Sequence, residues 1–127
     1  MKKPLVYIAS PYTMGDVGVN LRSVADVFAE LMCEGECVPY SPIVATHLHH
    51  LMIPQSYNAW LEHCFDFIPH CDAMLRVNAV HYGFVDYIQE ESEGADREVE
   101  LAKELGIPVF YEIESLGHWL EAQNEDV

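Results

Sequence analysis

The stretch SEGADREVELAKELGIPVFY, residues 92–111, holds a helix followed by a strand, and this pairing decides the fold class. From Gly94 to about Leu105, apolar side chains recur at the spacing of an amphipathic helix. Gly106 then ends the helix. The run that follows it is short, apolar and β-rich, as expected for a buried strand. Upstream of this unit the chain repeats the same alternation of strand-like and helix-like segments.

The alternation predicts a parallel sheet. We expect strands at residues 4–9, 37–40, 72–78 and 107–111, and helices at about 20–34, 57–69, 94–105 and 115–123. Residues 43–55 have no clear pattern. Strands that alternate with helices form parallel sheets covered on both faces. The sequence therefore predicts one α/β domain over residues 1–127, a doubly wound, flavodoxin-like or Rossmann-like sheet of four to five strands.

The composition limits the function classes. The 127 residues carry a formal net charge of −15 and are half hydrophobic, which is typical of a folded domain. This charge argues against a nucleic-acid polymer as ligand, because phosphate backbones are bound by clustered Lys and Arg. One small phosphorylated ligand remains possible at a helix N-terminus. No run is long and apolar enough to span a membrane, and no secretory signal is evident. We therefore expect a cytoplasmic protein with four free cysteines.

Glu98 stands out because its direction on the helical wheel lies inside the apolar arc of the helix. It is either a structural acid satisfied by backbone N–H groups and the helix dipole, or a reactive group held in a cleft. In a sheet of order 2-1-3-4, ligands bind beyond the carboxyl ends of the first and third strands. The expected site then comprises residues 10–13, the loop after Asn78, and the helix that begins near Gly94. Glu98 points toward this place.

Three segments resemble the nucleoside 2-deoxyribosyltransferase superfamily, which includes the 2′-deoxynucleoside 5′-monophosphate N-glycosidases. They are residues 7–11 (YIASP), the segment from Trp60 to the strand that follows Asp72, and the Ser92-x-Gly94-x-x-x-Glu98 motif with its downstream Gly-Ile-Pro-Val. The chain also looks like an uncharacterised bacterial and phage branch of this group. The resemblance implies the same α/β fold, no cofactor and a homo-oligomeric assembly.

The resemblance also implies a reaction and roles for single residues. Glu98 would be the nucleophile that attacks the anomeric carbon of a deoxyribose, and Tyr7 would orient its carboxylate. The products would arise by hydrolysis or by transfer to a second base. Ser92 stands where the monophosphate hydrolases bind phosphate, which favours a nucleotide over a nucleoside. One position departs from the family pattern, because Cys64 stands where an Asp is usual.

Further candidates come from their positions around the expected site. Asp86 is a candidate proton donor or contact to the base. A phosphate could bind the backbone N–H groups of residues 94–96 with help from two serines. The substrate-binding candidates are Ser10, Pro11, Tyr12, Asn78, Ser92, Gly94 and Asp96. Each has a structural explanation as well: Ser92 could be a turn or cap residue, and Tyr7 could be a core aromatic.

Two other functions stay open. A zinc site for metal-assisted hydrolysis could use the histidines, namely His47, His49, His50, His63 and His70. The same fold could also bind a nucleotide without cleaving it and serve as a sensor. For a homo-oligomer, the candidate interface elements are the loop at residues 82–87, which is rich in aromatic residues, and Trp119 in the last helix.

Overall fold

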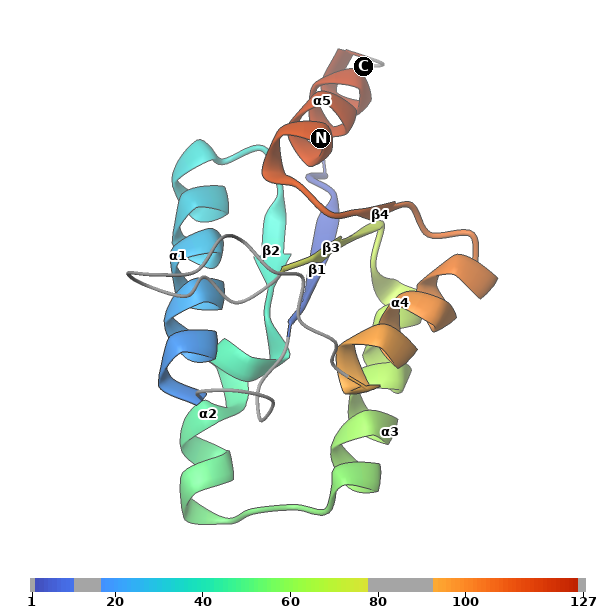
Figure 1. Ribbon diagram of the computed structural model, residues 1–127. Coiled ribbons are helices and arrows are strands. Elements are labelled where there is room, and N and C mark those ends of the chain that lie inside the picture. The colour runs from blue at the N-terminus through green and yellow to red at the C-terminus, as the bar shows by residue number, and fades with distance from the viewer. Residues whose placement is uncertain (1, 11–16, 78–92, 126–127) are drawn as a thin grey trace.

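The computed structural model describes residues 2–10, 17–77 and 93–125 (Figure 1). Four strands alternate with helices along the chain. The strands are β1 (Leu5–Ala9), β2 (Val38–Tyr40), β3 (Ala73–Arg76) and β4 (Val109–Phe110). The helices are α1 (Val17–Glu34), α2 (Pro42–Met52), α3 (Tyr57–Phe67), the short 3₁₀ helix η1 (Ile68–His70), α4 (Glu93–Glu104) and α5 (Ile113–Glu125).

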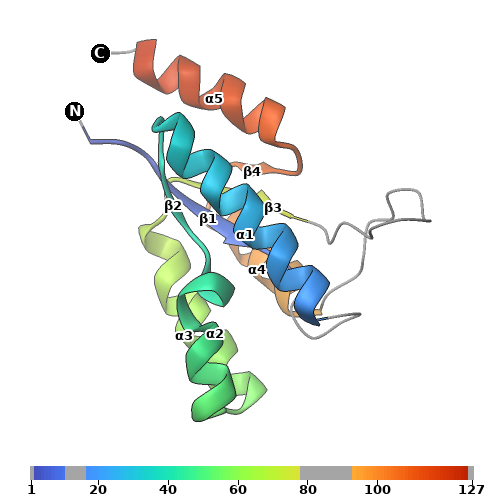
Figure 2. The ribbon, with the colours of Figure 1, turned by 90° about the vertical axis from the view of Figure 1, so that its left-hand side faces the viewer.

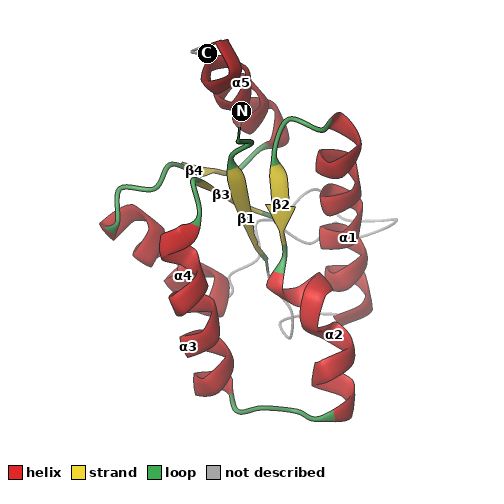
Figure 3. Cartoon of the chain, turned by 180° about the vertical axis from the view of Figure 1, so that it is seen from behind, coloured by secondary structure: helices red, strands yellow, loops and turns green. Residues whose placement is uncertain are grey.

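The four strands form one parallel sheet in the order β2-β1-β3-β4 (Figure 3). Tyr7 of β1 is paired with Tyr40 of β2 on one side and with Met74 of β3 on the other. The predicted α/β class is thus confirmed, and the strand order is the one assumed when the expected site was placed. β1 and β3 lie side by side at the centre, so the strand order reverses between them.

Helices cover both faces of the sheet, as the two views in Figures 1 and 2 show. On one face, α1 and α5 pack against strand residues such as Ile8 and Leu75 through Leu31 and Leu120. The opposite face is covered by α3 and α4, and its core is separate. This second core comprises Tyr7, Ala9, Cys64, Ile68, Cys71, Met74, Ala95, Val99 and Ala102. The candidate nucleophile lies on this second face.

Local signals explain where the helices begin and end. The hydroxyl of Ser41 accepts a hydrogen bond from the backbone N–H of Val44 at 3.1 Å and caps α2, which takes up residues 43–52 of the segment that had no clear pattern. Ser56 caps α3 in the same way, because its hydroxyl accepts a hydrogen bond from the backbone N–H of Ala59. Gly35 follows the end of α1 with a φ of +71°, a conformation that side chains other than glycine's rarely adopt.

The helical wheels of the helices predicted at 20–34 and 94–105 place Asn20 and Ser23 on the polar side and Met32 and Leu105 on the apolar side, and these four orientations are wrong. Asn20 and Ser23, expected to face solvent, are buried and make interactions within the structure. Met32 and Leu105, expected to face the core, are exposed. Met32 and Leu105 lie near the C-terminal ends of their helices. A helical wheel gives the direction of a side chain but not whether the sheet still lies beneath it at that point. None of the helices in the described residues is both long and apolar enough to cross a bilayer.

Candidate functional site

Glu98 lies on the inward side of α4, as the helical wheel predicted, and only 9% of its surface is exposed. Burial raises the pKa of its carboxyl from the ordinary 4.5 to about 8, because a charged carboxylate loses its hydration there. Interactions with the hydroxyl of Tyr7, the thiol of Cys64 and the charge of Arg76 act in the opposite direction and lower it. The carboxyl therefore titrates near physiological pH, where both its neutral and its ionised form are populated.

Tyr7 extends from β1 toward Glu98 and has no solvent exposure. Its ring packs against Tyr40 and Phe67, with ring centroids 5.9 and 6.2 Å away. Burial first, and then the charge of Glu98, raise the pKa of its phenol well above the ordinary value. The Tyr7 hydroxyl is close enough to lower the pKa of the Glu98 carboxyl. Among the described residues, however, it makes no hydrogen bond of regular geometry. Catalytic hydrogen bonds are often long before a ligand binds.

Cys64 brings a third polar group to the same place, from α3. Its side chain is buried, and burial together with the charge of Glu98 raises the pKa of the thiol to about 11. A neutral thiol is a weak hydrogen-bond donor to a carboxylate. Cys64 therefore lies beside the candidate nucleophile and adds no charge to the site.

A cavity of about 360 Å³ opens beside these groups, at the carboxyl end of β1. Its wall includes the side chains of Glu98 and Cys64. The other lining residues come from the end of β1, from α2 and α3 with the loop between them, and from the first turn of α4: Ser10, Pro42, Ile43, Thr46, His50, Gln55, Tyr57, Trp60, Leu61, Gly94 and Ala95. A cavity of this size and position is typical of a small-molecule site in a doubly wound fold.

The wall made by α2 and α3 is aromatic. The rings of His50 and Trp60 stack with their centroids 4.1 Å apart, and His49 and His63 approach Trp60 edge-on. The indole Nε1 of Trp60 is buried without a hydrogen-bond partner in the described structure. Flat rings with an available donor suit a planar heterocyclic ligand.

Three of the predicted ligand-binding residues are described by the structure, and two of them line the cavity. Ser10 does so with a buried hydroxyl that lacks a partner among the described residues, and Gly94 does so at the start of α4. Asp96 is not among the described lining residues, and its carboxylate lies 3.6 Å from Arg76 instead. The remaining predictions fall outside the described residues: Pro11, Tyr12, Asn78, Asp86 and Ser92.

Sequence reasoning missed two contributions to the site. One is the wall from α2, whose residues had been left unassigned. The other is Arg76, which is 1% exposed at the end of β3. A signal for Arg76 was present, because an arginine inside an apolar run that forms a central parallel strand must be buried.

The histidines of the zinc hypothesis do not gather into a ligand set. Within the described ranges, no three His, Cys, Asp or Glu side chains lie close enough together to hold a metal ion. Three of these histidines pack around Trp60 instead.

The environments of the cysteines predict selective alkylation. Cys33 is exposed, whereas burial raises the pKa of Cys37 and Cys64 to about 11 and that of Cys71 to about 12. Because the thiolate is the reactive form, we expect iodoacetamide at about pH 8 to modify Cys33 roughly 100-fold faster than the other three. Peptide mass spectrometry measures this, with urea-unfolded protein as the control in which all four react. Fast modification of folded Cys64 would contradict the neutral thiol beside Glu98.

The comparisons with known proteins add no assignment, because no protein-family model matches the chain and no curated protein matches it.

Proposed function

We propose that this protein cleaves the N-glycosidic bond of a 2′-deoxynucleoside or of its 5′-monophosphate, with Glu98 as the nucleophile. The observation that carries the proposal is a buried carboxyl, accompanied by a phenol and a thiol, in the wall of a ligand-sized cavity at the strand-order reversal. A carboxylate at such a position stabilises the positive charge that develops on a sugar when its base leaves. The likeness to the deoxyribosyltransferase superfamily supports the same chemistry.

The reaction divides into two displacements. The ionised Glu98 carboxylate bonds to the anomeric carbon, and the carbon–nitrogen bond breaks with its electron pair going to the base, which takes up a proton. Water, or the nitrogen of a second base, then attacks the anomeric carbon and gives up a proton, which balances the proton taken up by the first base. The ester bond breaks with its electron pair returning to the Glu98 carboxylate. Tyr7 would hold the carboxyl oriented during both steps. Asp86 remains the proposed contact to the base, and the phosphate would bind at the start of α4 near Ser10.

The proposal requires that free base is released. We expect at least one of the common deoxynucleosides or deoxynucleoside 5′-monophosphates to yield free base when incubated with the protein, as resolved by chromatography. Release that increases with a second added base, with a new nucleoside formed, would identify a transferase; release without such a product would identify a hydrolase. Chelator-treated protein should release base equally fast, since no step uses a metal.

The second candidate is a binding module of the same fold that holds a nucleotide without cleaving it. Cys64 at the position of a family acid favours this reading, because a neutral thiol lacks the charge of that acid. If a deoxynucleoside monophosphate binds tightly in calorimetry and none of the monophosphates releases free base, the protein is a binding module and the enzymatic proposal is wrong.

The cellular setting belongs to the proposal as well. A cytoplasmic location is supported by the four cysteines, which are all free. A small-molecule ligand is proposed because the cavity of about 360 Å³ has the size of a small-molecule site, and the charge of −15 disfavours a nucleic-acid polymer.

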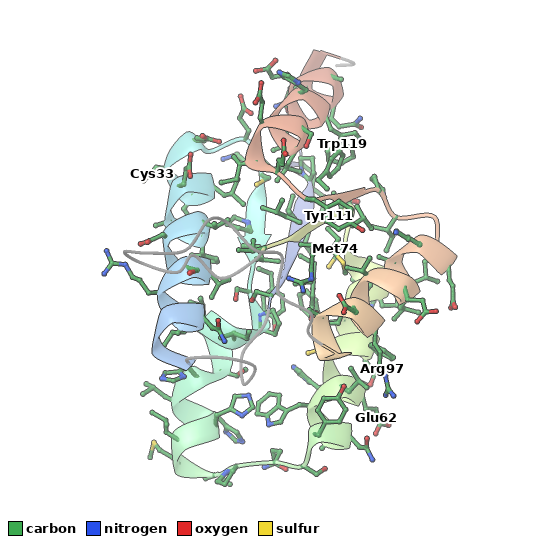
Figure 4. The ribbon with its side chains drawn as sticks, in the orientation of Figure 1. Cys33, Glu62, Met74, Arg97, Tyr111 and Trp119 are labelled. Atoms are coloured by element: carbon green, nitrogen blue, oxygen red, sulfur yellow. The ribbon has the colours of Figure 1, made fainter. Side chains whose placement is uncertain are left out.

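A homo-oligomer is also proposed, and α2 offers a surface for it. Residues 37–61 contain no Asp, Glu, Lys or Arg, although the chain carries 21 acidic side chains. Within this segment Leu48, Leu51, Met52 and Ile53 are 59–76% exposed. Two such acidic chains can approach here without repulsion between like charges. Of the two interface elements expected from the sequence, residues 82–87 lie outside the described residues. Trp119 packs on Phe110 within the chain, and Figure 4 shows its position on α5.

Light scattering during gel filtration measures the oligomer. We expect the wild-type chain to elute as a dimer or larger and the Leu51→Glu variant to elute as a monomer, because the new charge would be buried. Gln123→Glu adds the same charge on exposed α5 and should leave the assembly unchanged. A wild-type monomer would remove this part of the proposal.

A further inference from the structure

Two charged side chains are buried in the described part of the chain, Arg76 at 1% exposure and Glu98 at 9%. The whole sequence holds six Lys and Arg residues, so one of its few cations lies in the interior. Burying an unpaired charge costs several kcal/mol, roughly, and such groups are retained where they meet a partner or serve a function. Arg76 therefore needs an explanation beyond packing.

The register of the sheet places Arg76 on the same face as the candidate site. Side chains alternate along a strand, and Met74 of β3 belongs to the core under α3 and α4 together with Tyr7 and Ala9 of β1. Arg76 is two residues beyond Met74 and is paired with Ala9. Its side chain therefore extends from the carboxyl end of the central strand toward α4, the helix that carries Glu98.

The contacts of Arg76 connect this strand to the first turns of α4. Its Nη1 donates a hydrogen bond to the backbone carbonyl of Val77, and its Nη2 lies 3.6 Å from Oδ1 of Asp96. Asp96 precedes Glu98 by two residues on α4. The guanidinium is planar and always charged, so these contacts hold it in a fixed direction. Because the side chain of Asp96 is 55% exposed, its ion pair with Arg76 contributes little to stability by itself.

We propose that Arg76 is the positioning residue of this site, because it ties the start of α4 to the end of β3 through Asp96 and supplies the positive charge that favours the ionised form of Glu98. It does so without being among the described residues that line the cavity. Its contribution to catalysis rests on the proposed function, whereas its effect on the charge of Glu98 does not.

The other groups that face Glu98 cannot supply this charge. Tyr7 from β1 and Cys64 from α3 are neutral near physiological pH, since burial raises the pKa of both. Tyr40, from the end of β2, also interacts with Glu98 and has a raised pKa for the same reason. Among the described residues, Arg76 is the cation whose charge lowers the pKa of Glu98.

The test measures the pKa of Glu98 directly, by carbon NMR of its side-chain carboxyl, identified through the signal lost in Glu98→Gln. In Arg76→Met this pKa should rise by about one unit or more, and Arg76→Lys should restore most of it. The matched control is Arg97→Met, which removes the same charge next to Glu98 in sequence. Arg97 is exposed on α4 (Figure 4) and is not among the described residues that line the cavity, so its loss should move the pKa by less than about 0.3 units.

A second pair of variants tests the effect of Arg76 on the pKa of Glu98 without changing Arg76 itself, in case Arg76→Met does not fold. Asp96→Asn and Glu100→Gln each remove one exposed acid two residues from Glu98, on either side of it. Asp96 partly neutralises Arg76, so Asp96→Asn should lower the pKa of Glu98 clearly more than Glu100→Gln does. Equal shifts within this pair, or within the arginine pair, would overturn the role of Arg76.

Activity separates this inference from the proposed function. If base is released, the acid limb of kcat/KM against pH should shift with the pKa of Glu98 in each variant, which a purely structural role would not produce. If no substrate releases base, the proposed function fails and the NMR titration still decides what Arg76 does to Glu98.

Discussion

Glu98→Gln should lower base release from the best substrate by a factor on the order of 10³ or more, while the protein stays folded. Glutamine has nearly the shape of glutamate, so it preserves the contacts with Tyr7 and Cys64. Its amide cannot form the glycosyl ester on which the two displacements depend. The measurement is the initial rate of free base by chromatography, at a pH of about 8 or above, where much of the wild-type carboxyl is ionised.

Glu100→Gln is the matched control, because Glu100 is on the same helix but exposed to solvent. It should retain most of the wild-type rate. Calorimetry on Glu98→Gln should still detect substrate binding, since the aromatic wall and Ser10 are unchanged. A Glu98→Gln rate within a few-fold of wild type would rule out the nucleophile, and an equal loss in Glu100→Gln would point to a defect of the helix.

The fold was readable from the sequence because its signals are local. The apolar runs of β1 and β3, the cap at Ser56 and the glycine after α1 each act within a few residues. The cap at Ser41 is just as local, but it was not recognised, and α2 was left unassigned. Given four strands separated by helices, the handedness of parallel connections leaves few possible orders. Helix ends were less predictable, because the exposure of Met32 and Leu105 depends on where each helix passes the edge of the sheet.

The candidate site was only partly readable, because its parts come from distant segments. The burial of Glu98 followed from the wheel of its own helix. The stacking of His50 on Trp60 depends on how α2 packs beside α3, which no local pattern encodes. Arg76 lay in an apolar strand, but its nearness to Asp96 required the register between β3 and α4. Of the described residues that were expected from position alone, Ser10 and Gly94 line the cavity and Asp96 does not.

The raised pKa of Glu98 should make the protein lose stability as the pH rises. The folded carboxyl titrates at about 8 and the unfolded one near 4.5. Between these values the folded state binds more protons than the unfolded state, so the free energy of unfolding falls as pH increases through this window. The slope approaches about 1.4 kcal/mol per pH unit, and the total reaches roughly 4 kcal/mol by pH 8 and above. This is a large fraction of the stability of an ordinary domain.

Urea unfolding of wild type and Glu98→Gln across the same window isolates this effect. Glutamine does not titrate, so the stability of the variant relative to wild type should increase by several kcal/mol between about pH 5 and pH 8. His50, whose pKa burial lowers, acts in the opposite direction, but it is common to both proteins and cancels in the difference. Glu100→Gln, on exposed helix surface, should follow the wild-type curve. A difference that stays constant with pH would mean that the carboxyl of Glu98 is ionised in the folded protein. Its burial would then be offset by stronger contacts with Arg76 and Tyr7 than the structure indicates.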